Sequence, residues 1–285
     1  MGVVRPVRRE DLEGLLALLR HMDQEESRKA LAPEARDLEG LAEELEDGLV
    51  LVREGRVEGY VGLYPFWDGA VLEGPITYRR EDLSPLLEGV LSLARPRNHT
   101  RLYAFPNEKN TDLQAALERA GFVALFTTYY FVKPPEGLDA SPPPGVEIQK
   151  GFPGPTVYRE VYQKSEDAWG LRLRWTDEEL EEHFQDPGIV LFVAYEKGRP
   201  VGMAEVEKED KEATLAYLGV IPEARGKGIG RALLAKAAEW ARKKGARLLR
   251  VRAHDHEKEA VDLYRRLGFT LEEGVVTYLK EMAAR

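Results

Sequence analysis

The chain has 285 residues, of which 43% are hydrophobic and 32% charged, so it can bury a substantial core and form two average domains. It contains no cysteine, which excludes disulfides, thiolate metal sites and cysteine nucleophiles. The formal net charge of −9 argues against general nucleic-acid binding, and the lack of a secretory-type start or a long apolar run predicts a cytoplasmic protein without a membrane span.

The first half of the chain predicts strands and helices in alternation. Apolar residues recur at helical spacing between residues 9 and 20, where Leu12, Leu15 and Leu19 share one face. Ser84 followed by Pro85 is a typical helix start. We expect strands at 3–7, 49–53, 57–64, 71–78, 101–105 and 122–133, and helices at 9–20, 38–45, 84–94 and 112–120.

A proline-rich stretch, KPPEGLDASPPPG at 133–145, predicts a stiff, extended linker. The same order of elements then repeats. We expect strands at 146–149, 189–195, 200–207, 215–221, 248–253 and 275–280, and helices at 158–164, 177–184, 229–244 and 258–267.

Two local matches support a duplication. EGRVEGYVG at 54–62 parallels KGRPVGMA at 197–204, and NTDLQAALERAGF at 110–122 parallels EKEAVDLYRRLGF at 257–269. We therefore predict two α/β domains of one fold, residues 1–135 and 146–285, joined by a linker at 136–145.

The most informative stretch is LAYLGVIPEARGKGIGRALL, residues 215–234. An apolar run with strand composition ends at Pro222, a basic, glycine-rich turn follows, and a helix begins near Ile229. This order places several free backbone N–H groups at the positive end of a helix, an arrangement that binds phosphate or pyrophosphate. Arg225, Lys227 and Arg231 are the cations best placed to meet such a ligand.

Other interpretations of this turn fit less well. A dinucleotide-binding turn would have glycine where Arg231 stands, and a nucleotide-triphosphatase turn would have serine or threonine after Lys227, where Gly228 stands. A third interpretation is a glycine turn that only joins a strand to a helix.

The C-terminal half resembles the GNAT acetyltransferases. It carries V-x-P-x-x-R-G-x-G-x-G from Val220 to Gly230, and A-x-x-x-Y-x-x-x-G-F from Ala260 to Phe269. The resemblance covers nearly all of 146–285, whereas for 1–135 it depends on the duplication. The arrangement is similar to the mycothiol synthase-like tandem acetyltransferases.

The resemblance implies an α/β protein of two tandem GNAT-like domains, each with a mixed central sheet flanked by helices. It implies an acyl-CoA-dependent N-acyltransferase whose C-terminal domain transfers an acyl group, expected to be acetyl from acetyl-CoA, directly to the primary amine of a small molecule or peptide. The Tyr264 hydroxyl would protonate the CoA thiolate. The residues expected to bind the cofactor are Leu218, Gly219, Val220, Arg225, Gly226, Lys227, Gly228, Ile229, Gly230 and Arg231.

The sequence leaves the general base open. Glu205 on the preceding strand is one candidate, a histidine of His254-Asp255-His256 is another, and a water relay is a third. These histidines also have a metal-like spacing, but on a short polar loop we expect no metal. Trp169 and Trp175 precede a helix in the region that lines the acceptor site in GNAT folds.

The N-terminal half lacks these features. Its strand-to-helix turn has no glycine and contains Glu81 and Asp82, and Leu117 stands where Tyr264 stands in the second half. We expect this half not to bind CoA productively, but to buttress the catalytic half and form part of the wall of the acceptor site. The main alternative function is a non-catalytic acyl-CoA-binding sensor or scaffold, which would keep the glycine turn without needing Tyr264. The acceptor amine and the oligomeric state stay open.

Overall fold

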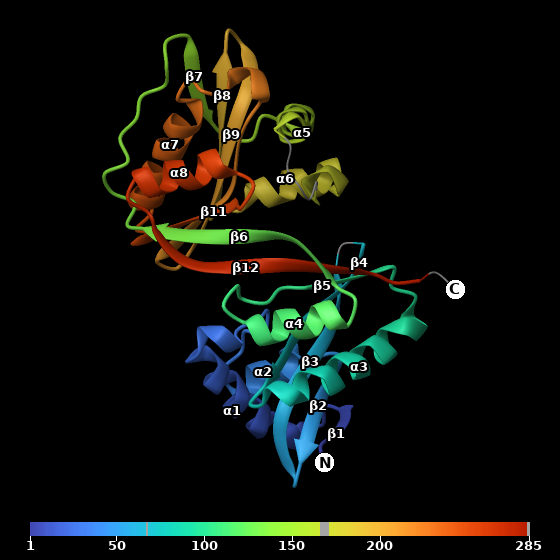
Figure 1. The fold of residues 1–285 in the computed structure, drawn as a ribbon. Coiled ribbons are helices and arrows are strands. Elements are labelled where there is room, and N and C mark those ends of the chain that lie inside the picture. Colours follow the sequence, from blue (N-terminus) through green and yellow to red (C-terminus); the bar gives the residue numbers. More distant parts are fainter. Residues whose placement is uncertain (67, 166–170, 284–285) are drawn as a thin grey trace. The chain divides into compact units, whose positions relative to one another are not determined.

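The computed structural model describes residues 1–66, 68–165 and 171–283 (Figure 1). The chain divides into two compact units, which are described separately. Unit 1 comprises Met1–Tyr129, His254–Lys258 and Glu273–Arg285, and unit 2 comprises Tyr130–Ala253 and Glu259–Glu272. Two long strands, β6 (Val123–Lys133) and β12 (Thr270–Glu281), are therefore divided between the units.

Unit 1 contains a mixed sheet in the order β1-β2-β3-β4-β5-β12. The last residues of β12 pair antiparallel with β5, whereas β4 and β5 are parallel. The remaining elements of the unit are β1 (Val3–Pro6), α1 (Leu12–Asp23), α2 (Leu38–Glu44), β2 (Gly48–Arg53), β3 (Arg56–Phe66), β4 (Gly69–Thr77), α3 (Leu83–Ala94), β5 (Arg101–Ala104) and α4 (Thr111–Arg119).

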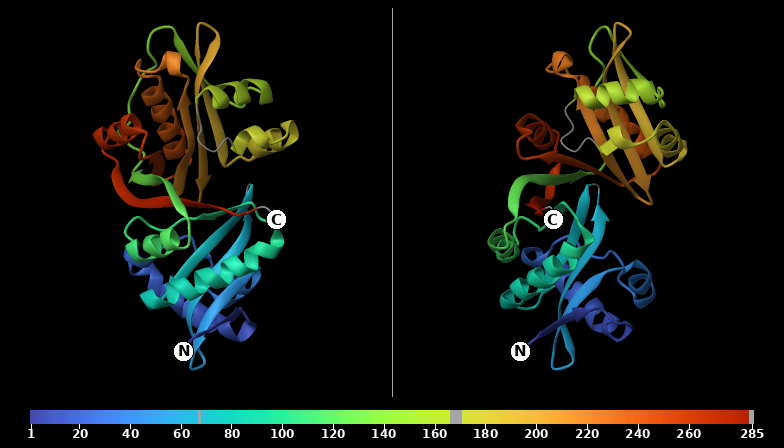
Figure 2. Two further views of the ribbon diagram at one scale, coloured as in Figure 1. Left: turned by 45° about the vertical axis from the view of Figure 1, so that its right-hand side comes forward. Right: turned by 90° about the vertical axis from the view of Figure 1, so that its right-hand side faces the viewer.

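Helices cover both faces of the unit 1 sheet (Figure 2). Because successive strand residues point to opposite faces, Tyr60 of β3 packs among the leucines of α1 and α2, while its neighbour Val61 packs among those of α3 and α4. Two buried apolar clusters result, one on each face.

Unit 2 repeats this plan, with strands in the order β11-β10-β9-β8-β7. On β9, Gly202 faces Leu233 of α7, whereas Met203 packs among the aromatic side chains of α5 and α6. Thus α7 covers one face of β8–β10, and α5 and α6 cover the other (Figure 2). The elements are β7 (Val146–Lys150), α5 (Pro155–Lys164), a 3-10 helix (Leu171–Arg174), α6 (Asp177–Gln185), β8 (Ile189–Glu196), β9 (Arg199–Glu209), β10 (Glu212–Val220), α7 (Ile229–Lys243), β11 (Leu248–His254) and α8 (Lys258–Arg266).

The α/β class predicted from the sequence is confirmed. Each of the twelve expected strands and eight expected helices has a counterpart among the described residues, within a few residues of its expected bounds. The sequence repeat assigns all of 146–285 to one domain, whereas the contacts group 254–258 and 273–285 with unit 1. No helix in the described ranges is long and apolar enough to span a membrane.

Candidate active site

Strands β10 and β11 diverge in the middle of unit 2. They pair in parallel through Glu212–Thr214 and Leu248–Arg250, and the described residues show no pairing between them beyond that point. β10 continues to pair with β9 as far as Val220, past an irregularity at Ala216. The Arg252 side chain reaches across and donates to the Ala216 carbonyl oxygen at 3.4 Å.

This divergence leaves main-chain donors of β10 without strand partners. The N–H of Ile221 donates to the Val201 carbonyl oxygen of β9 at 2.9 Å. Since N–H direction alternates along a strand, the N–H groups of Leu218 and Val220 point away from β9, toward the side where the described residues show no pairing with β11. Gly219 is required for packing, because a Cβ there would come within 2.3 Å of the Tyr217 hydroxyl.

The turn after β10 is open on its outer side. Gly226 and Gly228 have φ angles of 77° and 87°, and a Cβ built on either would meet no atom within 4 Å. The first main-chain bond of α7 runs from the Ala232 N–H to the Gly228 carbonyl oxygen at 3.1 Å. The N–H groups of residues 228–231 therefore have no partner within the helix, so the turn presents a row of donors at the positive helix end.

The three cations expected at the turn differ in the hydrogen-bond and ion-pair partners that they have within the protein. Arg225 donates to the carbonyl oxygens of Val220 at 2.9 Å and Ser165 at 3.4 Å. Lys227 forms an exposed ion pair with Glu196 at 3.1 Å. Arg231 is exposed and has no ion pair among the described residues. Because exposed ion pairs contribute little stability, Lys227 can turn to an incoming anion at small cost.

Glu205 is fully buried and both of its carboxylate oxygens are engaged. The Tyr158 hydroxyl donates to Oε1 at 3.3 Å. Arg172 Nη2 donates to Oε2 at 2.8 Å, and His183 Nε2 lies 3.2 Å from the same oxygen. Glu205 is 0% exposed, so it cannot touch a substrate unless one of these partners moves.

The surroundings of Glu205 combine aromatic rings and charge. In the strand register Glu205 stands opposite Tyr217, whose hydroxyl lies 2.6 Å from Ser165 Oγ. Burial, with Glu205 adding to it, raises the pKa of the Tyr158 hydroxyl well above its ordinary value. Burial and the charge of Glu205 likewise raise the pKa of Glu207.

His183, Glu205 and Glu207 each offer one ligand atom, and these atoms lie within 4.8 Å of one another, as metal ligands would. Arg172 Nη2, however, lies 2.8 Å from Glu205 and 3.7 Å from Glu207, so a guanidinium already supplies positive charge to this cluster. This donor set fits an arginine-centred ion-pair network better than a metal site, so the expectation of no metal stands as a prediction.

Comparisons with known proteins indicate the family. The model described as "Acetyltransferase (GNAT) family" matches residues 157–269. A mycothiol acetyltransferase of Thermomonospora curvata is 27% identical over 273 residues, spanning 85% of this chain and 88% of that protein. An uncharacterized N-acetyltransferase of Methanocaldococcus jannaschii is 36% identical over 97 residues, and the match spans 31% of this chain and 42% of that protein.

Two solved structures share the fold over nearly the whole chain. A GCN5-related N-acetyltransferase from Sphaerobacter thermophilus is 18% identical with a TM-score of 0.76, covering 98% of this chain and 95% of that one. A tandem GNAT protein from the clavulanic acid biosynthesis pathway, also 18% identical, has a TM-score of 0.66 and covers 100% of both chains. The chain is a tandem GNAT N-acetyltransferase. Its family transfers acyl groups from acyl-CoA, in general acetyl-CoA, to small-molecule or other amine acceptors.

Tyr264 of this tandem GNAT protein lies on α8 and is 2% exposed. Its ring packs edge-on against Phe269, with centroids 5.6 Å apart, and lies 6.0 Å from Phe131. The residue is thus part of the core of unit 2, and its role as the acid toward the thiolate remains a prediction.

The other candidate bases belong to a different unit. His254 Nδ1 lies 2.9 Å from Thr128 Oγ1, and its ring packs against Phe126 at 4.5 Å, all within unit 1.

Trp175 lies beside the Glu205 cluster, because the Arg172 Cζ atom stands 4.2 Å from its ring centre. Trp169 lies outside the described residues.

In unit 1 of this acetyltransferase, the corresponding gap between β4 and β5 is filled by the chain itself. The two strands pair in parallel only through 70–72 and 102–104 among the described residues. Farther along, the Leu31 N–H donates to the Phe105 carbonyl oxygen at 3.0 Å, and the Gly74 N–H donates to the Leu31 carbonyl oxygen at 2.7 Å. The Asn107 N–H donates to the Lys29 carbonyl oxygen at 2.9 Å. Residues 29–31 thus take the main-chain bonds that a ligand would need.

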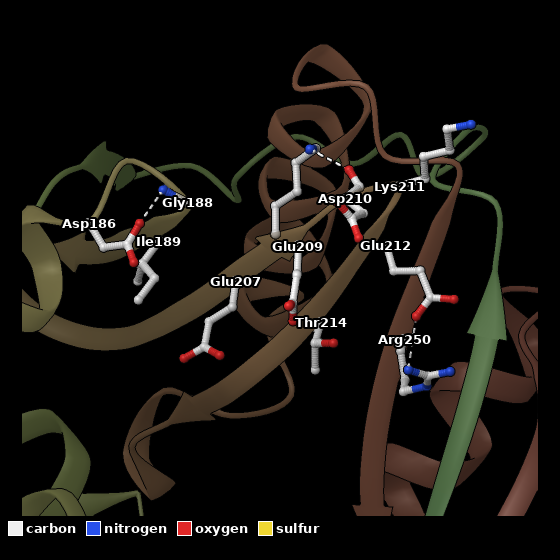
Figure 3. A pocket seen from close by; sticks show the side chains of 11 residues that line it. Asp186, Gly188, Ile189, Glu207, Glu209, Asp210, Lys211, Glu212, Thr214 and Arg250 are labelled. Atoms are coloured by element: carbon white, nitrogen blue, oxygen red, sulfur yellow. Dashed lines mark hydrogen bonds and ion pairs between the residues drawn. The ribbon is translucent and has the colours of Figure 1, made fainter. Parts of the chain in front are cut away.

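A cavity of about 990 Å³ lies beside the hairpin that joins β9 to β10 (Figure 3). Glu207 and Glu209 of β9 and Glu212 of β10 line it, and Glu212 pairs with Arg250 at 3.2 Å. The glycine turn follows the opposite end of β10, roughly 26 Å away at 3.3 Å per residue. This cavity is therefore separate from the turn.

Proposed function

We propose that residues 146–285 form the catalytic domain, which binds acetyl-CoA and transfers its acetyl group directly to a primary amine. The observation that carries the proposal is the open turn at Gly226–Gly228, which follows the part of β10 where the N–H groups of Leu218 and Val220 point away from β9 and β11 is no longer paired. One set of donors suits a diphosphate and the other suits the amides and thioester of a pantetheine arm.

In this proposal the N–H groups of residues 226–231 hold the pyrophosphate, with Lys227 and Arg231 as countercharges. Leu218, Gly219 and Val220 extend β10 along the arm. The Val220 N–H faces the thioester oxygen, where negative charge develops as the amine attacks. Main-chain donors suit this task because the strand fixes them before the substrate arrives.

The chemistry then needs two proton transfers. The amine nitrogen attacks the thioester carbonyl carbon, the C–S bond breaks, and the thiolate leaves with a proton from the Tyr264 hydroxyl. Glu205 serves as the base. Because its carboxylate is 0% exposed, we propose that the ammonium proton reaches it through His183, which is 14% exposed and lies 3.2 Å away.

We further propose that residues 1–135 are a degenerate, non-catalytic domain and that 136–145 is the linker. The filled gap between β4 and β5 supports this division, since an acyl-CoA arm would have to displace the main chain of residues 29–31. The turn before α3 supports it too, because it contains no glycine and its Asp82 is held in a buried ion pair with Arg53 at 2.8 Å.

The test is calorimetric titration with acetyl-CoA, followed by thiol release assayed with a panel of primary amines. We expect one molecule bound per chain and amine-dependent release of free CoA. Tight binding without release by any amine would favour the alternative, a non-catalytic acyl-CoA sensor. No binding at all would refute both functions.

A further inference from the structure

One buried donor in this chain has no partner. Among the buried side-chain nitrogen and oxygen atoms of the described residues, Arg172 Nη1 alone lacks a hydrogen-bond acceptor. Native proteins rarely leave such a group unpaired, and the exceptions concentrate where a ligand or a reaction supplies the partner.

The rest of the Arg172 side chain is fixed. Nη2 donates to Glu205, and the guanidinium lies against the Trp175 ring, with Cζ 4.2 Å from its centre. The side chain is only 18% exposed, and Nη1 is among its buried atoms, so bulk water does not reach this donor. A guanidinium held on one edge and one face points its remaining nitrogen in a set direction.

The position of this donor relates it to the proposed reaction. Arg172 binds Glu205, and Glu205 stands opposite Tyr217, the residue before the unpaired Leu218 N–H. Adjacent strands lie about 4.8 Å apart. Glu205 also shares a strand face with Met203, the face covered by α5 and α6 and opposite to α7. Arg172 Nη1 therefore belongs to the α5 and α6 side of the sheet. If the start of α7 holds the acetyl-CoA, the acceptor amine would approach the thioester from this α5 and α6 side.

Charge limits what this donor can bind. Arg172 carries a single positive charge and already has two carboxylates beside it, Glu205 at 2.8 Å and Glu207 at 3.7 Å. A carboxylate or phosphate at Nη1 would meet two carboxylates across one guanidinium, which costs free energy at such distances. An uncharged oxygen accepts the bond without that repulsion.

We propose that Arg172 Nη1 donates to an uncharged oxygen, a carbonyl or a hydroxyl, of the acceptor molecule, so that the substrate is a primary amine that also carries such an oxygen. This substrate class rests on the proposed function. The carbonyl form occurs in amino amides and peptide N-termini, and the hydroxyl form in amino alcohols and amino sugars.

The experiment compares four small amines of similar size as acceptors and as ligands of the CoA-loaded protein. Glycinamide offers a carbonyl, ethanolamine a hydroxyl, glycine a carboxylate and n-propylamine no oxygen. We expect kcat/KM and affinity at least tenfold higher for glycinamide or ethanolamine than for n-propylamine, and glycine no better than n-propylamine. A higher kcat/KM for glycinamide would identify the acceptor oxygen as a carbonyl, and a higher kcat/KM for ethanolamine would identify it as a hydroxyl.

Arg172→Lys tests the residue while keeping a cation for Glu205. A lysine places one nitrogen where arginine places two, so it cannot serve Glu205 and a substrate oxygen in the same fork geometry. We expect the advantage in kcat/KM and in affinity of glycinamide or ethanolamine over n-propylamine to fall to within twofold in this variant. The control is Arg174→Lys, an exposed position of the same 3-10 helix, which should leave the preference unchanged.

The outcomes separate this proposal from the function on which it rests. Equal use of all four amines, retention of the oxygen preference in Arg172→Lys, or no oxygen-dependent binding at any concentration would overturn the subsite while leaving acetyl transfer intact. Oxygen-dependent binding that Arg172→Lys removes, without CoA release from any amine, would support the subsite and refute the transferase.

Discussion

Glu205 of β9 stands directly opposite Tyr217 of β10, in the stretch where β10 has parted from β11. A buried carboxylate therefore lies one strand away from the main-chain donors assigned to the thioester. Its partners come from three other segments: Tyr158 of α5, Arg172 of the 3-10 helix and His183 of α6.

Glu205→Gln keeps the shape of this side chain and removes its charge. We expect kcat to fall at least tenfold, because an amide cannot take up the proton of the attacking amine. The free energy of unfolding should also fall by about 1–3 kcal/mol, since Arg172 loses its charged partner. Steady-state kinetics and urea unfolding measure the two effects. The control is Glu207→Gln, at a half-exposed neighbour. A kcat of Glu205→Gln within twofold of wild type would rule out Glu205 as the base.

Gly228→Val tests the anion cradle. Gly228 and Gly245 flank the same helix with φ angles of 87° and 85°, and neither position has an atom within 4 Å of a Cβ. Valine should cost roughly 1–3 kcal/mol of stability at either position because of the left-handed backbone. We expect the Kd for acetyl-CoA, measured by calorimetry, to rise at least 100-fold in Gly228→Val. The control Gly245→Val should leave this Kd unchanged. Equal effects of the two variants would mean that the turn does not hold the cofactor.

Tyr264→Phe removes one hydroxyl and retains the ring that packs against Phe269. General acids contribute about 10²–10⁴-fold, so we expect kcat to fall at least tenfold while the Kd for acetyl-CoA stays within twofold. Tyr195→Phe, on β8 of the same unit, should change neither value. If Tyr264→Phe instead alters only the Kd, the tyrosine contributes to binding and another group protonates the thiolate.

Leu31→Pro probes the segment that fills the gap in unit 1. Proline has no N–H, so the Phe105 carbonyl oxygen loses its donor, and we expect a loss of about 1–3 kcal/mol in the free energy of unfolding. Leu31→Ala keeps the N–H, and because Leu31 is 41% exposed it should cost less than about 1 kcal/mol. Urea unfolding compares the two. Equal losses would show that the main-chain bond is unimportant.

The elements and the glycine turn could be predicted because their signals are local. A strand composition, Pro222 and closely spaced glycines lie within one short stretch, and the structure forms the strand, turn and helix there. The Glu205 network had no such signal. Tyr158, Arg172 and His183 lie 47, 33 and 22 positions away from Glu205, and each reads as an ordinary residue of its own helix.

Long-range main-chain pairing also leaves little trace in the sequence. Residues 29–31 bridge β4 and β5 through backbone groups, which every residue type except proline provides. In the same way, the antiparallel pairing of Tyr278 with Ala104 joins the end of the chain to unit 1, and no motif marks either strand for the other.

Glu73 gives unit 1 a pH-dependent stability. It is 9% exposed, and the Tyr60 hydroxyl donates to its Oε1 at 3.3 Å. Burial raises the pKa of Glu73 from 4.5 to about 7, a shift that Glu44 and Glu34 increase and the hydrogen bonds of Tyr60 and Tyr64 oppose. Because the folded-state pKa is the higher one, the contribution of Glu73 to stability is greatest below pH 4.5, declines as the pH rises from 4.5 to 7, and is then constant.

Glu73→Gln should remove this decline. At about 1.4 kcal/mol per pKa unit the decline amounts to at most about 3.5 kcal/mol, so we expect the variant to be roughly 1–3 kcal/mol more stable than wild type at pH 8 and no more stable at pH 4.5. Urea unfolding from pH 4.5 to 8.5 measures the difference. The control is Glu43→Gln, at an exposed position of α2, which should follow the wild-type curve. Parallel curves for wild type and Glu73→Gln would mean that Glu73 ionises alike in the folded and unfolded chains.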